Sequence, residues 1–303
     1  LAAGAPGNAD GGNDRGGVWI LFLKDEGRVR DQQKIADGAG GFNGDLADDD
    51  RFGSGVALVG DVNGDGIADL AVGAPNDDSD SQDAGAIWIL FMRTDGRVDD
   101  WQRITEGSGG FNGNLRTGDG FGSAVAGAGD LDGDGIPDLI VGAPGDDGSG
   151  TDRGALWVLF LNAEGRVRDQ QKIADGEGGF SGDLANDDRF GSAVARNGDI
   201  HRDGVEDLAE GAPNDDDGSG NAGAVWIVFL EADGRVDGWQ KVSEQSGGFG
   251  GDLGAGDHFG AALASIGDLD NDGIVDLAVG APGDDDGGDD QGALWILFMQ
   301  RTN

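Results

Sequence analysis

The stretch FGSAVAGAGDLDGDGIPDLIVGAP, residues 121–144, decides the fold because its pattern recurs every 69 residues along the chain. The two motifs that bound it keep this spacing: Phe-Gly begins at Phe52, Phe121, Phe190 and Phe259, and Gly-Ala-Pro begins at Gly4, Gly73, Gly142, Gly211 and Gly280. A repeat of this length is a supersecondary unit that buries its apolar faces against its neighbours. We therefore expect a single repeat domain over residues 1–303, with units at about 1–51, 52–120, 121–189, 190–258 and 259–303.

Short apolar runs bounded by Gly, Asp and Asn predict four strands in the unit 121–189. They cover about 121–129, 139–143, the run around Trp157 and Phe160, and 166–173. The third run is apolar throughout, which is typical of a strand covered on both faces. In the fourth, Val167 and Ile173 should face inward while the charged residues mark an edge. Four short antiparallel strands per unit predict an all-β fold of propeller blades.

The aromatic residues keep the same register. All 13 Phe fall into three series spaced like the Phe-Gly motif, and five of the seven Trp follow a fourth series. Large rings dominate core energetics, so their fixed phase indicates that every unit packs its core alike.

Composition restricts the partners. A formal charge of -39 argues against nucleic-acid binding and against adhesion to anionic lipid, and favours cations. The apolar runs are too short to cross a bilayer. The chain begins at Leu1 without Met, so we expect any signal peptide to be removed or to lie outside the sequence. The absence of Cys fits an extracellular or cell-surface protein stabilised by metal instead of disulfides.

An acidic loop stands between the first two predicted strands of each unit. In GDLDGDGIPDL, residues 129–139, Asp occupies positions 1, 3, 5 and 9 counted from Asp130, and Gly occupies position 6. With a backbone carbonyl at position 7, this spacing wraps oxygen ligands around Ca²⁺. Asp-Gly turns are common, but three copies in one register strengthen the prediction. Oxygen ligands in a flexible loop favour Ca²⁺ over Zn²⁺ or Mg²⁺.

We predict three well-formed Ca²⁺ sites and a degraded fourth. The predicted ligands, with each Ile acting through its carbonyl, are Asp61, Asn63, Asp65, Ile67 and Asp69; Asp130, Asp132, Asp134, Ile136 and Asp138; and Asp268, Asp270, Asp272, Ile274 and Asp276. In the fourth copy His201 replaces the third ligand and Arg202 adds a positive charge. Weak or absent metal is expected there, although the remaining ligands are Asp199, Asp203, Val205 and Asp207.

A second acidic cluster follows each Gly-Ala-Pro except the first. Its members are Asp77 and Asp78, Asp146 and Asp147, Asp215 to Asp217, and Asp284 to Asp286. They fit either further Ca²⁺ sites of weaker geometry or solvated charged loops. We favour solvated loops, because charge runs are most often solvent-exposed.

The units alternate in their fourth strand. Odd units carry RVRDQQKIADG, whereas even units have Trp101 or Trp239 where the odd ones have Gln32 or Gln170. The pattern indicates that a block of two units was copied and gives the molecule two alternating surfaces.

The combination of Phe-Gly, a D-x-[DN]-x-D-G-x-x-D loop and Gly-Ala-Pro resembles the FG-GAP repeat of integrin alpha-subunit propellers and of many bacterial secreted proteins. The resemblance covers nearly the whole chain. It implies a β-propeller with one blade per repeat and structural Ca²⁺ in the loop that joins the first two strands.

The number of blades stays open between four and five. Four blades form if residues 259–276 join the N-terminal strands and leave 277–303 over; five form if each terminal blade lacks one strand. An open blade edge can pair with another chain, so the incomplete terminal blades predict head-to-tail polymerisation.

Three functions fit these observations. The first is a non-enzymatic extracellular scaffold, stabilised by Ca²⁺ and used for adhesion or for surface or fibre assembly, with self-association or another extracellular protein or glycan as partner. The second is lectin-like glycan binding, in which Trp101 and Trp239 would stack on sugars, although edge packing is favoured for both. The third, a secreted hydrolase, is least supported: only two His and no Cys are present, so acid–base and nucleophilic constellations are scarce.

Overall fold

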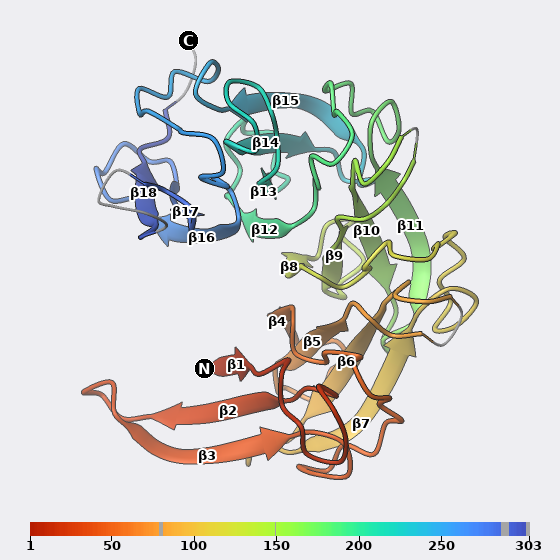
Figure 1. The fold of residues 1–303 in the computed structure, drawn as a ribbon. Helices are drawn as coiled ribbons and strands as arrows, with labels where there is room; N and C mark the ends of the chain where they lie inside the picture. Colours follow the sequence, from red (N-terminus) through yellow and green to blue (C-terminus); the bar gives the residue numbers. More distant parts are fainter. Residues whose placement is uncertain (79–80, 149, 286–290, 301–303) are drawn as a thin grey trace. The chain divides into compact units, whose positions relative to one another are not determined.

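The computed structural model describes residues 1–78, 81–148, 150–285 and 291–300 (Figure 1). Over these residues every regular element is a β-strand, and the strands form five separate antiparallel sheets. No helix in the described part of the chain is long and apolar enough to cross a membrane. Contacts between Cα atoms divide the chain into two compact units, residues 1–141 with 159–170 and residues 142–158 with 171–303. The single domain expected over residues 1–303 stays a prediction.

The chain is a five-blade β-propeller in which each sheet is one blade. Blade 1 holds β1 (Ala2–Gly4), β2 (Val18–Leu23) and β3 (Val29–Ile35). Blade 2 holds β4 (Val56–Gly60), β5 (Asp69–Ala74), β6 (Ala86–Met92) and β7 (Val98–Ile104), and blade 3 holds β8 (Val125–Gly129), β9 (Asp138–Ala143), β10 (Ala155–Leu161) and β11 (Val167–Ile173). Blade 4 holds β12 (Ala193–Arg196), β13 (Leu208–Ala212), β14 (Ala224–Leu230) and β15 (Val236–Val242), and blade 5 holds β16 (Ala262–Gly267), β17 (Asp276–Ala281) and β18 (Ala293–Leu297).

The predicted four-stranded blade is confirmed. In blade 3 the second and fourth strands begin within one residue of the expected positions and the third contains Trp157 and Phe160, whereas β8 starts at Val125, four residues later than expected. Phe121 instead forms an isolated parallel bridge with Gly85. Val167 and Ile173 are both buried, as predicted. The four-blade alternative is wrong, because β16 pairs with β17 in a sheet of its own.

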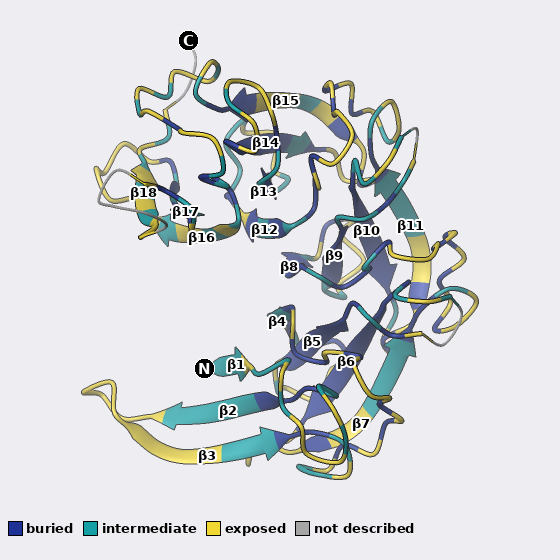
Figure 2. Cartoon of the chain, in the orientation of Figure 1, coloured by how far each residue is buried: buried dark blue, intermediate teal, exposed yellow. Residues whose placement is uncertain are grey.

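The third strands of the interior blades are buried on both faces. Every residue of β6 and of β10 is buried, which explains why these runs are apolar throughout (Figure 2). A one-sided strand would instead alternate between apolar and polar residues.

Glycines of the two recurring motifs allow close contact between successive blades. A Cβ atom placed on Gly73, in the Gly-Ala-Pro of blade 2, would lie 1.9 Å from the carbonyl oxygen of Gly122, in the Phe-Gly that precedes β8. Within the second compact unit, a Cβ atom placed on Gly211 would likewise lie 2.0 Å from the carbonyl oxygen of Gly260. Only residues without a side chain permit this approach, so the two motifs recur together because each contacts the other.

The aromatic core repeats as expected. In the first unit, Phe42 stacks on Phe52 at 5.1 Å between ring centroids and meets the edge of Trp88 at 5.2 Å. In the second unit, Phe180 lies 5.0 Å from Phe190 and 5.3 Å from Trp226. Such offset and edge-to-face pairs stabilise the core beyond the area that they bury.

Candidate metal centre

The loop between β8 and β9 curls around its own carboxylates. The backbone N–H of Gly135 donates to Asp130 at 2.9 Å, that of Asp134 to Asp132 at 3.2 Å, and that of Ile136 to Asp134 at 2.9 Å. Gly135 adopts a φ of 90°, a left-handed conformation that favours glycine and accounts for the Gly at position 6. The backbone thus turns the acidic side chains inward.

All four loops take this conformation. The N–H of the residue at position 6 donates to the carboxylate at position 1 at 2.8 Å in the first loop, 3.0 Å in the His201 copy and 2.9 Å in the last. Arg202 and Asn271 at position 4 share a φ of 64°. The substitutions in the fourth copy therefore change the ligands and leave the loop backbone in place.

The Asp at position 9 serves first as an anchor between strands. Asp138 is fully buried, and its two oxygens accept the backbone N–H groups of Leu131 and Leu161, each at 3.0 Å. Asp69, Asp207 and Asp276 make the equivalent pairs of bonds. The sequence predicted these residues only as ligands, whereas the structure shows that they also tie the loop to the end of the third strand.

Two of the predicted sites bring three carboxylates close enough to share one ion. In these clusters, one oxygen from each residue lies within 4.8 Å of the others; they are Asp130, Asp132 and Asp138, and Asp268, Asp270 and Asp276. In the first loop Asn63 takes the third position, and its amide donates to Asp65 at 3.2 Å. Carboxylate and amide oxygens are the donors that Ca²⁺ prefers, so the residues present fit that ion.

The pKa of Asp138 is raised to about 6, mainly by burial and also by the charges of Asp132 and Asp134, against two backbone N–H groups that lower it. Self-repulsion among the carboxylates is thus part of the free energy of this loop. A bound divalent cation would supply the opposite charge.

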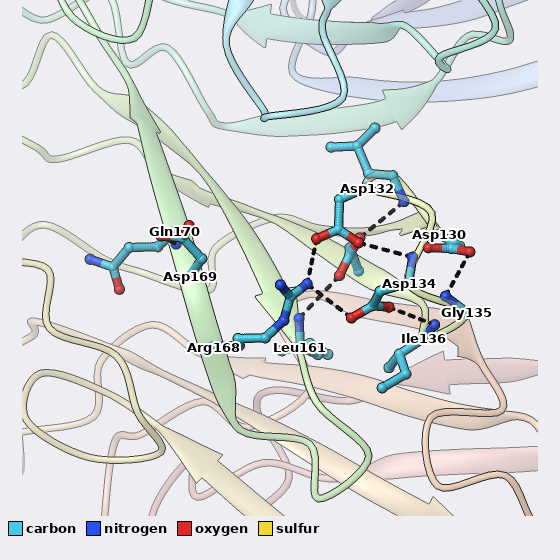
Figure 3. Close-up of polar contacts among 11 residues, drawn as sticks. Asp130, Asp132, Asp134, Gly135, Ile136, Leu161, Arg168, Asp169 and Gln170 are labelled. Atoms are coloured by element: carbon cyan, nitrogen blue, oxygen red, sulfur yellow. Dashed lines mark hydrogen bonds and ion pairs between the residues drawn. The ribbon is translucent and has the colours of Figure 1, made fainter.

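An arginine from the fourth strand reaches the blade 3 loop, as Figure 3 shows. The Arg168 guanidinium forms ion pairs with Asp132 and, at 2.9 Å, with Asp134. Sequence reasoning missed this residue, although the alternation between RVRDQQ and RVDDWQ or RVDGWQ in the fourth strands was a signal for it.

The fourth loop holds an imidazole among its carboxylates. His201 lies 3.0 Å from Asp207 through Nδ1 and 3.1 Å from Asp203 through Nε2. Burial lowers the pKa of His201, but its hydrogen bond to Asp207 and the charges of both carboxylates outweigh this and raise it. Asp199, His201 and Asp203 still come within 4.8 Å of one another. The expectation of weak or absent metal at this copy stays a prediction.

The second acidic clusters are not simply solvated loops, and this prediction was wrong for the first residue of each. The leading residues are buried: Asp77, Asp146, Asp215 and Asp284. Asp77 pairs with Arg103 of β7, and Asp215 lies 2.6 Å from Lys241 of β15. The following Asp78, Asp216 and Asp285 are exposed, as expected, and Asp286 lies outside the described residues.

In blades 2 and 4 the charge of the leading residue acts on a second buried carboxyl, which comes from the loop before Phe-Gly. In blade 2 the pKa of Asp50 is raised to about 7, mainly by burial and also by the charge of Asp77, although the Ala47 N–H and Arg103 lower it. Each basic partner stands 26 residues after its Asp: Arg103 after Asp77, Lys172 after Asp146 and Lys241 after Asp215. That constant spacing was the overlooked sequence signal.

Glu210 breaks the repeat in the second strand of blade 4. It replaces a Val and is fully buried, and the Gly191 N–H donates to one of its oxygens while the other has no hydrogen-bond partner among the described residues. Burial raises its pKa well above the ordinary value, with Asp215 and Asp188 adding to the rise.

The two fourth-strand tryptophans pack on third-strand tryptophans. Trp101 meets Trp88 edge-on at 4.8 Å and donates its indole N–H to Asn43 at 2.8 Å. Trp239 meets Trp226 at 5.0 Å, donates to Ser181 at 3.3 Å and is 36% exposed. Glycan stacking by Trp101 and Trp239 stays a prediction.

Comparison with known proteins agrees with this architecture. The model of the family described as FG-GAP repeat matches residues 52–90, 121–159 and 259–297. Three segments of the chain are therefore similar to FG-GAP repeats. The three matched segments are those with the complete acidic loops, and the copy that contains His201 lies outside them.

Among curated relatives, the chain is 38% identical to Integrin alpha-PS5 of Drosophila melanogaster over 168 residues, covering 54% of this chain and 15% of the relative. It is 32% identical to Integrin alpha-4 of Xenopus laevis over 170 residues, covering 56% and 15%. It is also 30% identical to Phosphatidylinositol-glycan-specific phospholipase D of Bos taurus over 175 residues, covering 57% and 20%. The chain is thus similar to parts of integrin alpha subunits, and it spans a fifth or less of these relatives.

Proposed function

We propose that this chain is a non-enzymatic extracellular scaffold, stabilised by Ca²⁺ and used for adhesion or for surface or fibre assembly. The observation that carries the proposal is the recurrence of one inward-curled acidic loop in four copies. The similarity to integrin alpha subunits supports an adhesion role at the cell surface.

Ca²⁺ would act as a structural ion. Each loop sets its carboxylates beside a buried Asp that joins two strands, so repulsion inside the loop opposes the correct pairing of the blade. An ion that binds the folded state alone stabilises it by mass action. Loops of modest affinity would stay filled outside the cell, where free Ca²⁺ is of order millimolar.

Exposed apolar residues on blades 1 and 5 support association with further copies of the chain. In β18 and just beyond it, Leu294, Ile296 and Phe298 are 70%, 38% and 54% exposed. The residues at the same repeat positions in blade 2 are all buried, namely Ile87, Ile89 and Phe91. Blade 5 therefore presents an apolar face that a neighbouring blade covers elsewhere in the chain.

Blade 1 presents the complementary face. Trp19 and Leu21 of β2 are only half-buried and Leu23 is exposed, whereas the corresponding residues of blade 2 are buried in one cluster with Val18 and Ile20 of blade 1. The face of blade 5 corresponds by repeat to the Val18 face. It can therefore pack on blade 1 of a second copy as blade 1 packs on blade 2, with exposed apolar area as the driving force.

Thermal unfolding of metal-free protein, with and without millimolar Ca²⁺, tests the structural role of the ion. We expect Ca²⁺ to raise the Tm by about 10 °C or more. Asp65→Ala should remove part of this rise, and Asp203→Ala, the same position in the His201 loop, should remove less. Equal Tm values in Ca²⁺ and in chelator would reject the proposal.

A further inference from the structure

One residue near the start of the fourth strand alternates between a cation and an anion along the chain. It is Arg30 in blade 1, Asp99 in blade 2, Arg168 in blade 3 and Asp237 in blade 4. The general scaffold function gives no reason for this alternation, but the position of Arg168 does.

The Arg168 side chain extends from β11 across to the loop between β8 and β9 (Figure 3). One guanidinium nitrogen pairs with both Asp132 and Asp134, which occupy loop positions 3 and 5. These carboxylates would each give an oxygen to a bound ion. Arg168 thus places a positive charge on two of the predicted ligands.

Blade 2 lacks this arrangement. Its residue at the same position, Asp99, pairs with Arg93 of the adjoining hairpin. Among the described residues, no ion pair involves Asp61 or Asp65, the first and fifth positions of the blade 2 loop. Within the part of the chain that the structure describes, no protein cation pairs with these two carboxylates, so the blade 2 loop depends on the solvent for one.

We propose that Arg168 is a tethered counter-cation that occupies the blade 3 loop until a divalent cation displaces it. The inference rests on the proposed binding of Ca²⁺ by these loops. It divides them into two kinds: the blade 3 loop binds Ca²⁺ more weakly and is less disordered by its removal, whereas the loops at 61–69 and 268–276 bind more tightly and need the ion more.

Competition between the two cations gives this result. A guanidinium that contacts two carboxylates must be released before those oxygens can coordinate, and the free energy of the lost ion pairs is subtracted from the free energy of ion binding. Exposed ion pairs contribute up to about 1 kcal/mol, and Arg168 is 44% exposed. The expected change in affinity on removing the charge is therefore about fivefold.

The test compares Arg168→Gln with Arg30→Gln by calorimetric titration of metal-free protein with calcium chloride. Arg30 is the matched control: it stands at the same repeat position, lies 5.8 Å from the Phe22 ring, and has no acidic loop before it in this chain. Both variants lose one positive charge. We expect Arg168→Gln to tighten one site about fivefold and Arg30→Gln to leave the isotherm unchanged.

Unfolding without metal gives a second readout of opposite sign. In chelator Arg168→Gln should be less stable than Arg30→Gln, because Asp132 and Asp134 lose the cation that pairs with both of them, and saturating Ca²⁺ should remove this difference. If wild-type protein binds Ca²⁺ but the two variants titrate and unfold alike, the inference is wrong and the proposed function stands. If wild-type protein binds no Ca²⁺, the proposed function itself fails.

Discussion

The third strands of blades 2 and 5 carry almost the same sequence in different surroundings. In β6, AIWILFM is buried at every residue, whereas in β18 the exposed and half-buried residues of ALWIL alternate (Figure 2). The alternation follows from the strand period of two, with one face covered by the chain and the other open. A third strand therefore needs apolar residues on both faces only where a neighbouring blade covers each face.

The largest expected effect comes from placing a charge at the same position in both strands. Ile89→Asp should destabilise the protein by about 4 kcal/mol or more, because the side chain of residue 89 is fully buried in an apolar strand. Ile296→Asp should cost less than about 1 kcal/mol in dilute protein, since that face is open. Chemical denaturation measures the free energy of unfolding of both variants, and equal losses of stability would contradict the difference between the two strands.

Glycines at matched positions sharpen the comparison. Gly73→Ala drives a Cβ into the Gly122 carbonyl and should cost roughly 3 kcal/mol. Gly280, the same motif position in blade 5, would place its Cβ 3.4 Å from that of Ala262, an ordinary contact. Gly280→Ala should therefore be neutral or slightly stabilising. Similar urea midpoints for the two variants would show that the motif does not serve blade contact.

The smallest expected effect concerns blade 4, whose second strand differs from the others through Glu210. Because its pKa is raised in the folded state, its contribution to stability is fully present below the unfolded pKa and is lost as pH rises through the folded pKa. Glu210→Val, which restores the residue of blades 2, 3 and 5, should gain stability relative to wild type at pH 7.5. That gain should shrink toward pH 4.5. Urea midpoints of both proteins at the two pH values measure it, and a gain that is equal at both would contradict the prediction.

The sequence predicted most of the fold because the repeat multiplies each signal. Phe-Gly, Gly-Ala-Pro and the aromatic series gave the blade, its strands and the loop in one register. The late start of β8 was not predicted, because Phe121 is apolar like a strand residue but bridges to Gly85 of the preceding blade. A contact between successive repeats leaves no period-two pattern within either repeat, so the sequence does not reveal it.

The sequence predicted which carboxylates of a loop converge, but not which residues of other strands surround them. Spacing within one loop indicates which side chains converge, whereas Arg168 lies 36 residues from Asp132 and reaches it only through the pairing of strands. The burial of Asp77 and Asp215 was missed for the same reason: their basic partners stand on the fourth strand. From sequence alone, a loop rich in Asp is predicted to be solvent-exposed, because the strand that supplies its basic partner is distant in the chain.

Sedimentation velocity in millimolar Ca²⁺ over increasing protein concentration tests the central claim most directly, that the open faces of blades 1 and 5 join copies of the chain. For wild-type protein we predict a concentration-dependent shift to larger species, absent in Ile296→Asp. A wild-type chain that stays monomeric at high concentration would contradict the claim.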